Sequence, residues 1–441
     1  MDASVSRAGL ARDEALKALA RIRQGYPVSD AIQQAKGLPA RDRALMATLV
    51  YGVLRHLRYL DAWMKPFVRG DLEPEVQDIL RMAFYQMGFL DRVPDYAAVN
   101  AAVEQTRARA PRAVGMVNAI LRRGQSKKPE QLSLGERYSH PDWIVERWQA
   151  RYGPRLESIL EANNAVPPLT LRVDLDRTSR AEVLEELGNL GIDAEPSPYL
   201  PEAIRVRGSL WLEDFEPFRR GWVTVQDESG MLVAWVLDAQ PGDEVLDMAA
   251  GLGGKALHVL ERSGGAVRLT CLDISRPRLR RLEENLSRTG RGDQAAIKEA
   301  NAVQFGNSHQ GSFERIILDA PCSGLGVLRR RVDARWKKQA NDLPAFHETQ
   351  VELLDAAWRA CRAGGVIVYS TCSTEPEETE AVVDEVLARR PDLRREDVTP
   401  YLPHPDLASF VKNGALSLTP GDLGMDGFYI ARLRVKKEAV Q

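Results

Sequence analysis

The first third of the chain has apolar positions that recur every three or four residues, which is typical of amphipathic helices. Two such stripes are Leu45, Leu49, Val53, Leu57 and Leu60, and Ile79, Leu80, Ala83, Phe84 and Met87. Proline or glycine interrupts the pattern three times, at Gly37-Leu38-Pro39, Glu73-Pro74 and Val93-Pro94-Asp95. Because these residues end helices, we expect an all-α bundle of about five to seven helices without an internal repeat.

The pattern changes after Pro167. Residues 169–175 (LTLRVDL) alternate as a strand does, Ser179–Gly191 has a helical period, and strands are expected at Ala203–Val206 and Trp222–Gln226. This order predicts a small α+β segment. From there on, strands and helices alternate as in a doubly wound, Rossmann-like parallel sheet. The expected strands are Glu244–Met248, Val267–Asp273, Ala296–Ala300, Arg315–Asp319 and Val366–Tyr369, with an antiparallel edge pair near Leu416–Leu418 and Gly427–Arg434.

These three patterns predict a multidomain protein. We expect an all-α domain over residues 1–130, a linker and small α+β domain over 131–225, and an α/β domain over 226–436. Charge supports the first division, because residues 1–130 hold 21 basic and 14 acidic groups, whereas the remainder holds 39 and 48. A basic helical surface could be a solvated face or an electrostatic footprint for nucleic acid, and the balance alone does not decide between them.

Composition places the chain among globular proteins. Hydrophobic residues make up 44% and charged residues 28%, which is too apolar for a disordered chain. The segment Met1–Glu14 carries both charge signs and no apolar signal-peptide core. Uncharged windows such as Ala44–Leu54 and Ala363–Thr374 are far shorter than the ~20 residues that cross a bilayer. We therefore expect a cytoplasmic protein that makes no membrane contact.

A small-residue loop follows the first predicted strand of the α/β domain, where Glu244–His258 reads EVLDMAAGLGGKALH. Its glycines let the backbone approach a ligand closely at the carboxyl edge of the sheet. The next strand ends at Asp273, 20 residues after Gly253, where a carboxylate can accept both ribose hydroxyls of a nucleoside cofactor. A tight structural turn is the alternative for the glycines alone. A P-loop is disfavoured, because no Lys-Ser/Thr pair follows them.

The chain has only four cysteines, and two of them end predicted strands. Their spacing gives no CxxC pair and no His partner at zinc spacing, so neither a disulfide framework nor a metal site is expected. Cys322 in DAPCSG and Cys372 in STCST follow consecutive strands, whose carboxyl ends would open into one crevice if the strands are neighbours. Small buried hydrophobes are the alternative, which we favour for Cys271 and Cys361. The polar flanks of the other two favour an exposed loop.

Several stretches together resemble the RNA 5-methylcytosine methyltransferases, which use S-adenosylmethionine. They are DMAAGLGGKALH, LDISRPRLRRLEENLSRTG, ILDAPCSGLGVLRRR, VIVYSTCSTEPEE and GMDGFYIARL. In the helical part, LVYGVLRHLRYLDAWM, RMAFYQMGFLDRVP and VGMVNAILRR are similar to the NusB-like domain carried by the branch that modifies small-subunit ribosomal RNA. The likeness runs from about Arg7 to Arg434, and the paired DAPCSG and TCS motifs are its specific part.

The resemblance implies a covalent mechanism on cytosine in 16S rRNA. Carbon 5 is a poor nucleophile, so a thiolate first adds at carbon 6. Cys372 matches the family's nucleophile, and Cys322 matches the residue assigned to removing the carbon 5 proton. Asp319 would bind the base or the cofactor's amino group, and Lys255 would favour the thiolate or orient substrate, unless it is an ordinary solvated lysine at a helix start.

The resemblance also implies a cofactor site and partners. The residues expected to hold S-adenosylmethionine are Ala249, Ala250, Gly251, Leu252, Gly253, Gly254, Lys255, Asp273, Asn301 and Asp319. The partner would be 16S ribosomal RNA, bound by a monomer. The sequence departs from the family pattern at five positions: Leu252 replaces proline, Asn301 replaces aspartate, Asp174 replaces asparagine, and Arg331-Val332 replaces Asn-Pro. These changes bear on cofactor affinity and RNA contacts, whereas both cysteines are kept.

A basic run follows DAPCSG closely, and it is expected to bind RNA. It comprises Arg329, Arg330, Arg331, Arg335, Lys337 and Lys338, with Trp336 among them. A solvated helix face is the alternative, but beside a site that takes an unstacked base the run fits a phosphate-contacting and stacking surface. His258 and His347 are expected to be structural. No metal is expected.

Two other functions stay open. The same chemistry could act on tRNA or on another rRNA site, and a noncatalytic RNA-binding assembly factor could be built on a methyltransferase with an altered glycine loop. A DNA cytosine methyltransferase is less favoured, because its nucleophile would be the cysteine of the Pro-Cys motif, here Cys322, and a second cysteine in a TC motif is not expected there.

Overall fold

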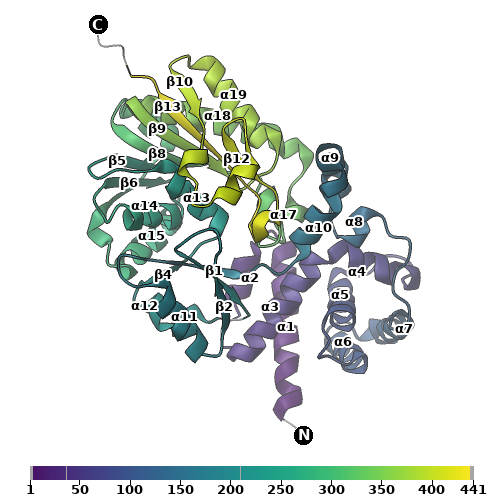
Figure 1. The fold of residues 1–441 in the computed structure, drawn as a ribbon. Coiled ribbons are helices and arrows are strands. Elements are labelled where there is room, and N and C mark those ends of the chain that lie inside the picture. The colour runs from purple at the N-terminus through teal and green to yellow at the C-terminus, as the bar shows by residue number, and fades with distance from the viewer. Residues whose placement is uncertain (1–2, 36, 209, 438–441) are drawn as a thin grey trace. The chain divides into compact units, whose positions relative to one another are not determined.

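The structure is a computed structural model that describes residues 3–35, 37–208 and 210–437 (Figure 1). The chain divides into two compact units. The helical unit comprises Met1–Ala165 and Leu328–Ala340, and the sheet unit comprises Val166–Val327 and Asn341–Gln441. The small α+β segment and the main sheet both belong to the sheet unit.

Helices make up the helical unit, as the period of its sequence predicts. They are α1 (Ala3–Arg23), α2 (Val28–Gln33), α3 (Ala40–Arg55), α4 (Leu57–Met64), α5 (Pro74–Phe89), α6 (Asp95–Arg109), α7 (Val114–Gly124), α8 (Leu134–Arg137), α9 (Asp142–Tyr152), α10 (Leu156–Asn164) and, from the later segment, α17 (Ala334–Lys337). Seven of these lie before residue 130 in the described part of the chain, which confirms the expected count. Helix α3 begins after Pro39, α5 at Pro74 and α6 after Pro94, because proline lacks the N–H that a helix interior needs.

Both predicted apolar stripes pack in the core of this unit. Leu49, Val53, Leu60, Ile79 and Phe84 are completely buried there. Val332 joins the same core although it lies more than 200 positions later in the chain. The later segment is therefore part of the folded helical unit.

The small α+β segment is a four-stranded antiparallel sheet in the order β2-β3-β1-β4. Its elements are β1 (Leu169–Val173), α11 (Arg180–Asn189), β2 (Asp193–Pro196), β3 (Ala203–Arg207), α12 (Glu216–Arg219) and β4 (Val223–Val225). Helix α11 begins with a capping box, in which the Ser179 hydroxyl and the Glu182 carboxylate satisfy each other's backbone N–H groups. The sequence pattern found three of these strands and missed β2, which is short and polar.

The main sheet has the strand order β11-β12-β13-β9-β8-β5-β6-β7, and β10 pairs with β13. The strands are β5 (Glu244–Asp247), β6 (Arg268–Asp273), β7 (Ala295–Glu299), β8 (Phe313–Asp319), β9 (Cys361–Thr371), β10 (Leu393–Glu396), β11 (Val411–Lys412), β12 (Ala415–Leu418) and β13 (Phe428–Val435). Strands β5 to β9 run parallel and β13 is antiparallel to β9, as expected. The strand order reverses between β5 and β8, which is the kind of switch point where α/β sheets bind ligands.

Alternate side chains along the buried strands enter two separate apolar layers. Val245, Ile317 and Val368 pack with α13 (Glu228–Leu237) and α14 (Gly254–Arg262). Leu246 and Ile316 pack on the other face with α16 (Ala302–Ser308), α18 (Leu343–Ala360) and α19 (Glu380–Arg389). Helix α15 (Arg276–Arg288) follows β6. Because both faces are covered, only the strand ends remain open for a site.

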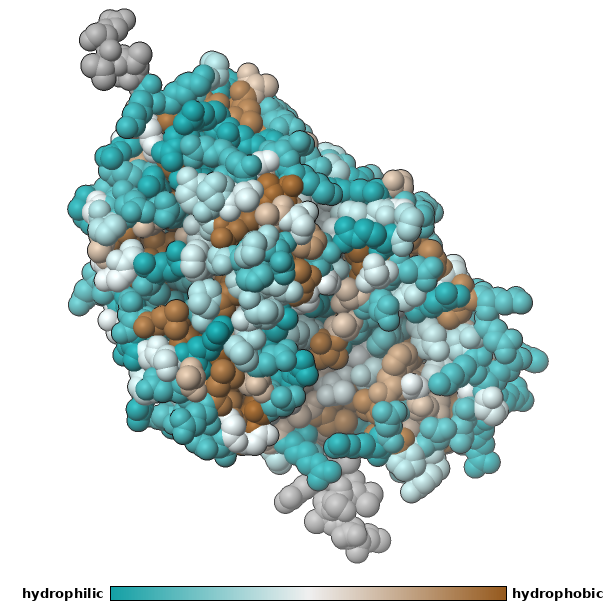
Figure 2. All heavy atoms as spheres, viewed as in Figure 1, coloured by the Kyte–Doolittle hydropathy of each residue, from teal (hydrophilic) through white to brown (hydrophobic). Residues whose placement is uncertain are grey.

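None of the helices among the described residues is both long enough and apolar enough to cross a bilayer. Figure 2 shows a face on which hydrophilic residues predominate and apolar ones form small scattered patches. Among the described residues, no cluster of His, Cys, Asp and Glu side chains has the arrangement of a metal site.

Candidate active site

The glycine loop after β5 takes a conformation that only glycine adopts easily. Gly251 and Gly253 have φ of 56° and 85°, in the left-handed region. The backbone N–H of Gly251 donates to Oδ2 of Asp273 (3.1 Å), so the loop is tied to the end of the neighbouring strand β6. A Cβ built on Gly254 meets nothing within 4 Å, and Leu252 is 46% exposed. The loop thus borders open space.

Asp273 and Asn301 lie where the next two strands end. Oδ1 of Asp273 accepts the backbone N–H of Ser275 (2.8 Å), and Oδ2 accepts that of Gly251. Because a carboxylate can accept about four hydrogen bonds, Asp273 can still accept hydrogen bonds from ribose hydroxyls. Oδ1 of Asn301 caps α16 by accepting the N–H groups of Val303 (2.9 Å) and Gln304 (3.1 Å). The residues therefore fit a nucleoside cofactor such as S-adenosylmethionine.

The two predicted site thiols lie side by side. Strands β8 and β9 pair in parallel with Asp319 opposite Ser370, and Sγ of Cys322 lies 3.2 Å from Sγ of Cys372. The hydrogen bond with Cys372, followed by burial, raises the pKa of the Cys322 thiol well above its ordinary value. The Cys322 thiol is therefore protonated near neutral pH.

An ion pair connects the glycine loop with the thiols. Nζ of Lys255, in the first turn of α14, lies 2.6 Å from Oδ2 of Asp319, and Oδ1 of Asp319 accepts the Ser370 hydroxyl (2.9 Å). Burial opposes the charge on Lys255, but Asp319, Asp247 and Cys372 outweigh it and raise its pKa. The ammonium is therefore held charged in the neighbourhood of Cys372.

Asp247, at the end of β5, is a buried carboxyl that interacts electrostatically with both members of this ion pair. Burial, opposed by Lys255 and assisted by Asp319 and Asp273, raises its pKa to about 7. Asp247 was not among the site residues predicted from the sequence. Its burial could not be read from the sequence, because it depends on which strands flank β5.

The other two cysteines are buried, as expected. Cys271 is completely buried in the layer that contains α14, and Cys361 is 5% exposed at the start of β9. Burial raises the pKa of Cys271 well above its ordinary value and that of Cys361 to about 12. Both thiols are inert near neutral pH.

The basic run divides into structural and exposed members. Arg335 is completely buried in the helical unit, where Nη1 donates to the carbonyl oxygen of Ser139 (3.0 Å) and Nη2 to that of Asn163 (3.0 Å). Burial, with Arg55 adding to it, lowers its pKa to about 9. Nε1 of Trp336 donates to the carbonyl oxygen of Leu54 (2.8 Å). This geometry gives no support to an RNA contact by either residue.

The remaining arginines of the run differ in exposure. Arg329 is 5% exposed and its carbonyl oxygen accepts Nη2 of Arg55 (3.0 Å), Arg330 is half-buried, and Arg331 is exposed. The buried members could have been suspected from Leu328 and Val332, apolar residues spaced among the arginines that indicate a face packed against something.

Two histidines that were expected to be structural lie beside glutamate carboxylates. His258 is buried with Nε2 3.1 Å from Oε1 of Glu202, and burial lowers its pKa. Nε2 of His347 lies 2.7 Å from Oε2 of Glu385.

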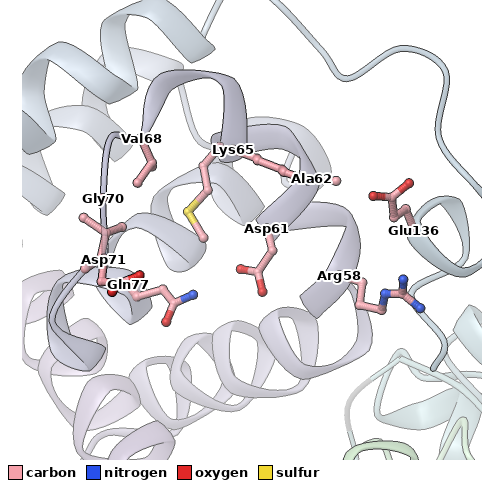
Figure 3. A pocket seen from close by; sticks show the side chains of 11 residues that line it. Arg58, Asp61, Ala62, Lys65, Val68, Gly70, Asp71, Gln77 and Glu136 are labelled. Carbon is pink, nitrogen blue, oxygen red and sulfur yellow. The ribbon is translucent and has the colours of Figure 1, made fainter. Parts of the chain in front are cut away.

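A separate hollow of about 680 Å³ lies on the helical unit, lined by residues of α4, of the segment between α4 and α5, of α5 and of α8 (Figure 3). Two of its charged residues form ion pairs: Arg58 with Asp142 (2.7 Å) and Asp61 with Arg81 (2.7 Å). None of the sequence-predicted site residues lines this hollow.

The doubly wound sheet, with its glycine loop and strand-end carboxylate, defines the class of the protein as a Rossmann-like enzyme suited to a nucleoside cofactor. The family model described as 16S rRNA methyltransferase RsmB/F matches residues 234–434, the NusB family matches residues 10–126, and the RsmF/B-like ferredoxin-like domain matches residues 140–211. The chain belongs to the ribosomal RNA small subunit methyltransferase B family, the 16S rRNA methyltransferases that carry a NusB domain.

Relatives align with almost the whole chain. The ribosomal RNA small subunit methyltransferase B of Pseudomonas putida is 36% identical over 89% of this chain and 90% of its own, and that of Vibrio cholerae is 34% identical over 93% of each. A probable ribosomal RNA small subunit methyltransferase B of Bacillus subtilis is 32% identical over 96% and 98%.

Solved structures agree in fold. One described as PH0851 has a TM-score of 0.81 at 23% identity and covers 97% of this chain and 98% of its own. NSun6 from Pyrococcus horikoshii, solved with SFG, has a TM-score of 0.59 at 22% identity over 68% of this chain and 99% of its own. The multidomain fold class and the methyltransferase activity expected from the sequence are thus confirmed, and the family implies S-adenosylmethionine as methyl donor. The domain boundaries at residues 130 and 225 stay a prediction.

Proposed function

We propose that this enzyme makes 5-methylcytosine in 16S rRNA through a covalent bond between Cys372 and carbon 6 of the target base. The observation that carries the proposal is the 3.2 Å separation of the Cys322 and Cys372 Sγ atoms at the ends of two neighbouring parallel strands. A structural role would not need two thiols together in polar loops beside a charged lysine.

The chemistry assigns one thiol to each half of the reaction. The Cys372 thiolate adds to carbon 6, which makes carbon 5 an enamine nucleophile. S-adenosylmethionine supplies the electrophilic methyl group. Cys322 then takes the proton from carbon 5, and the electron pair of that C–H bond restores the ring as the Cys372 sulfur leaves. Once Cys372 is bonded to carbon, the largest of the causes that raise the pKa of Cys322 is removed, which favours the action of Cys322 as the base.

The ion pair beside the thiols supports both steps. The Lys255 ammonium stabilises the Cys372 thiolate before attack. The Asp319 carboxylate is positioned by Lys255 and Ser370, and it would accept a hydrogen bond from the exocyclic amine of cytosine or from the amino group of the cofactor.

The same proposal assigns cofactor and RNA contacts. Residues 249–255 and Asp273 hold the cofactor, with Asn301 near its adenine, because the loop borders open space and the Asp273 carboxylate keeps acceptor capacity. In the basic run, Arg331 is the exposed member suited to contact a phosphate. Arg335 and Trp336 are left out of the proposed RNA surface.

The test combines labelled cofactor with cysteine variants. Wild type, Cys372→Ala, Cys322→Ala and the buried-thiol control Cys361→Ala are incubated with radiolabelled S-adenosylmethionine and undermethylated small-subunit rRNA. We expect label in cytosine with wild type and Cys361→Ala, no label with Cys372→Ala, and a persistent protein–RNA adduct with Cys322→Ala.

Other outcomes select the alternatives. Activity that survives in Cys372→Ala but not in Cys322→Ala would reverse the roles of the thiols. Transfer to tRNA and not to rRNA would change the substrate. Calorimetry that finds no binding of S-adenosylmethionine at millimolar concentration would favour the noncatalytic assembly factor.

A further inference from the structure

A buried carboxylate joins the two loops that carry the thiols. Glu378 follows β9 in a short 3-10 helix, Pro376–Glu378, and is completely buried. Its neighbours in space are Ser323 and Ser373, the residues immediately after Cys322 and Cys372. Both loops therefore contain a Cys-Ser pair whose serine reaches the same side chain.

The contacts of Glu378 satisfy both of its oxygens. Oε1 accepts the backbone N–H of Ser323 (2.7 Å) and Nε2 of Gln350 (3.2 Å). Oε2 accepts the hydroxyls of Ser323 and Ser373, whose oxygens lie 3.3 Å apart. Charge-assisted hydrogen bonds of this kind are roughly twice as strong as neutral ones, so the carboxylate holds the two serines firmly together.

The surrounding residues hold the carboxylate itself in place. Gln350, on α18, also donates to the carbonyl oxygen of Pro321 (2.9 Å), one residue before Cys322. The Tyr369 hydroxyl, on β9, donates to the carbonyl oxygen of Glu378 (2.8 Å). The side chains of Ser323, Ser373, Gln350, Tyr369 and Glu378 are all buried. Removing one partner would therefore leave a buried polar group unpaired, at a cost of about 1–3 kcal/mol.

We infer that Glu378 is a positioning residue that sets the distance between the two thiols by clamping Ser323 and Ser373. The Sγ–Sγ distance of 3.2 Å and the Oγ–Oγ distance of 3.3 Å are nearly equal, as expected when two equivalent dipeptides are held in register. The inference rests on the proposed function. In that reaction the distance between the thiols matters, because Cys322 must reach the proton on carbon 5 while Cys372 is bonded to carbon 6.

The first experiment compares Glu378→Gln with Glu348→Gln, which makes the same charge change at an exposed position of α18. A glutamine cannot accept all four donors, because its amide nitrogen is itself a donor. Since an error of about 1 Å in placement can cost about 10²-fold in rate, we expect kcat to fall by about 10–100-fold in Glu378→Gln. KM for S-adenosylmethionine and the circular dichroism spectrum should stay unchanged, and Glu348→Gln should match wild type.

A second readout needs neither RNA nor cofactor. Diamide oxidises two adjacent thiols to a disulfide by taking up their two electrons and two protons, and mass spectrometry of the digest follows the Cys322–Cys372 link. We expect this link to form at least about 10-fold more slowly in Glu378→Gln. This readout separates the two proposals, because it reports the thiol spacing even if the enzyme proves to modify another RNA.

Serine variants keep the inference testable if Glu378→Gln does not fold. Ser323→Ala and Ser373→Ala should each slow both methyl transfer and disulfide formation. When both changes are combined, the loss should be less than the product of the two single losses, because both hydroxyls act on one carboxylate. Wild-type rates in Glu378→Gln, or a loss of activity with an unchanged rate of disulfide formation, would overturn the inference; losses that multiply in the double serine variant would do the same.

Discussion

The side chains of Lys255 and Asp319 form an ion pair, with Nζ 2.6 Å from Oδ2, between the first turn of the helix after the glycine loop and the strand that leads to Cys322. It brings the predicted cofactor loop and the predicted thiols into one site, although the two residues are 64 positions apart.

Replacing Lys255 tests its effect on the thiols. In Lys255→Met the cation beside Cys372 is lost, so the thiolate is less stable and alkylation by iodoacetamide should require a higher pH than in wild type. Methyl transfer should fall by about 10²–10³-fold, the usual loss when one group that stabilises developing charge is removed. The exposed Lys412→Met is the control. An unchanged alkylation profile would mean that Lys255 does not affect the thiol.

The raised pKa of the Asp247 carboxyl predicts that the stability of the protein depends on pH. Burial raises its pKa from 3.8 to about 7, so between these values the folded state binds a proton that the unfolded state has released. Its contribution to stability is therefore present below about pH 4, decreases as pH rises towards about 7, and changes no further above that.

Asp247→Asn removes this titration. Above pH 7 the variant should gain up to about 4 kcal/mol in the free energy of unfolding, and the gain should shrink towards pH 4. Guanidinium unfolding of cofactor-free wild type and variant, measured across this range, gives the difference directly. A constant difference at all pH values would show that Asp247 titrates alike in both states.

Replacing Gly326 tests whether the close packing of its backbone against Cys372 and Gly427 is needed for activity. Its N–H donates to the carbonyl oxygen of Cys372 (2.9 Å), and a Cβ added there would meet the Gly427 carbonyl well inside van der Waals contact. Gly326→Ala should therefore displace the cysteine loop and lower methyl transfer by at least about 10²-fold. Gly292→Ala, where a Cβ meets nothing within 4 Å, should be fully active. Full activity in Gly326→Ala would show that the backbone here can give way.

Substitution of Arg335 should lower the stability of the protein, whereas substitution of Arg331 should weaken RNA binding. Arg335→Met leaves buried carbonyl acceptors of the helical unit without a donor, which should cost about 2–4 kcal/mol in the free energy of unfolding. Arg331→Met, at an exposed position, should leave stability unchanged and weaken RNA binding in a salt-dependent manner. Chemical denaturation and filter binding measure the two effects. Equal destabilisation by both variants would contradict this division.

The sequence determined the order of elements and the identity of the chemical groups. Apolar period, proline breaks and strand alternation give the helical unit and the main sheet, because these signals are local. The glycine loop, Asp273, Cys322 and Cys372 could be assigned to one edge, because consecutive parallel strands present their carboxyl ends together. The strands β2, β10 and β11 were missed, since each is too short or too polar to show a period.

Only the tertiary structure decided which charged side chains are buried and which groups they contact. Arg335 looks like its exposed neighbours in sequence, but it is enclosed by carbonyl groups from Ser139 and Asn163, about 200 residues earlier in the chain. Glu378 lies in an acidic stretch of sequence that is typical of a protein surface. Its carboxylate nevertheless accepts a hydrogen bond from the backbone N–H of Ser323, 55 positions away in the chain. A charge is stabilised inside a protein only by specific partners that the fold brings from distant parts of the chain, and no local pattern records them.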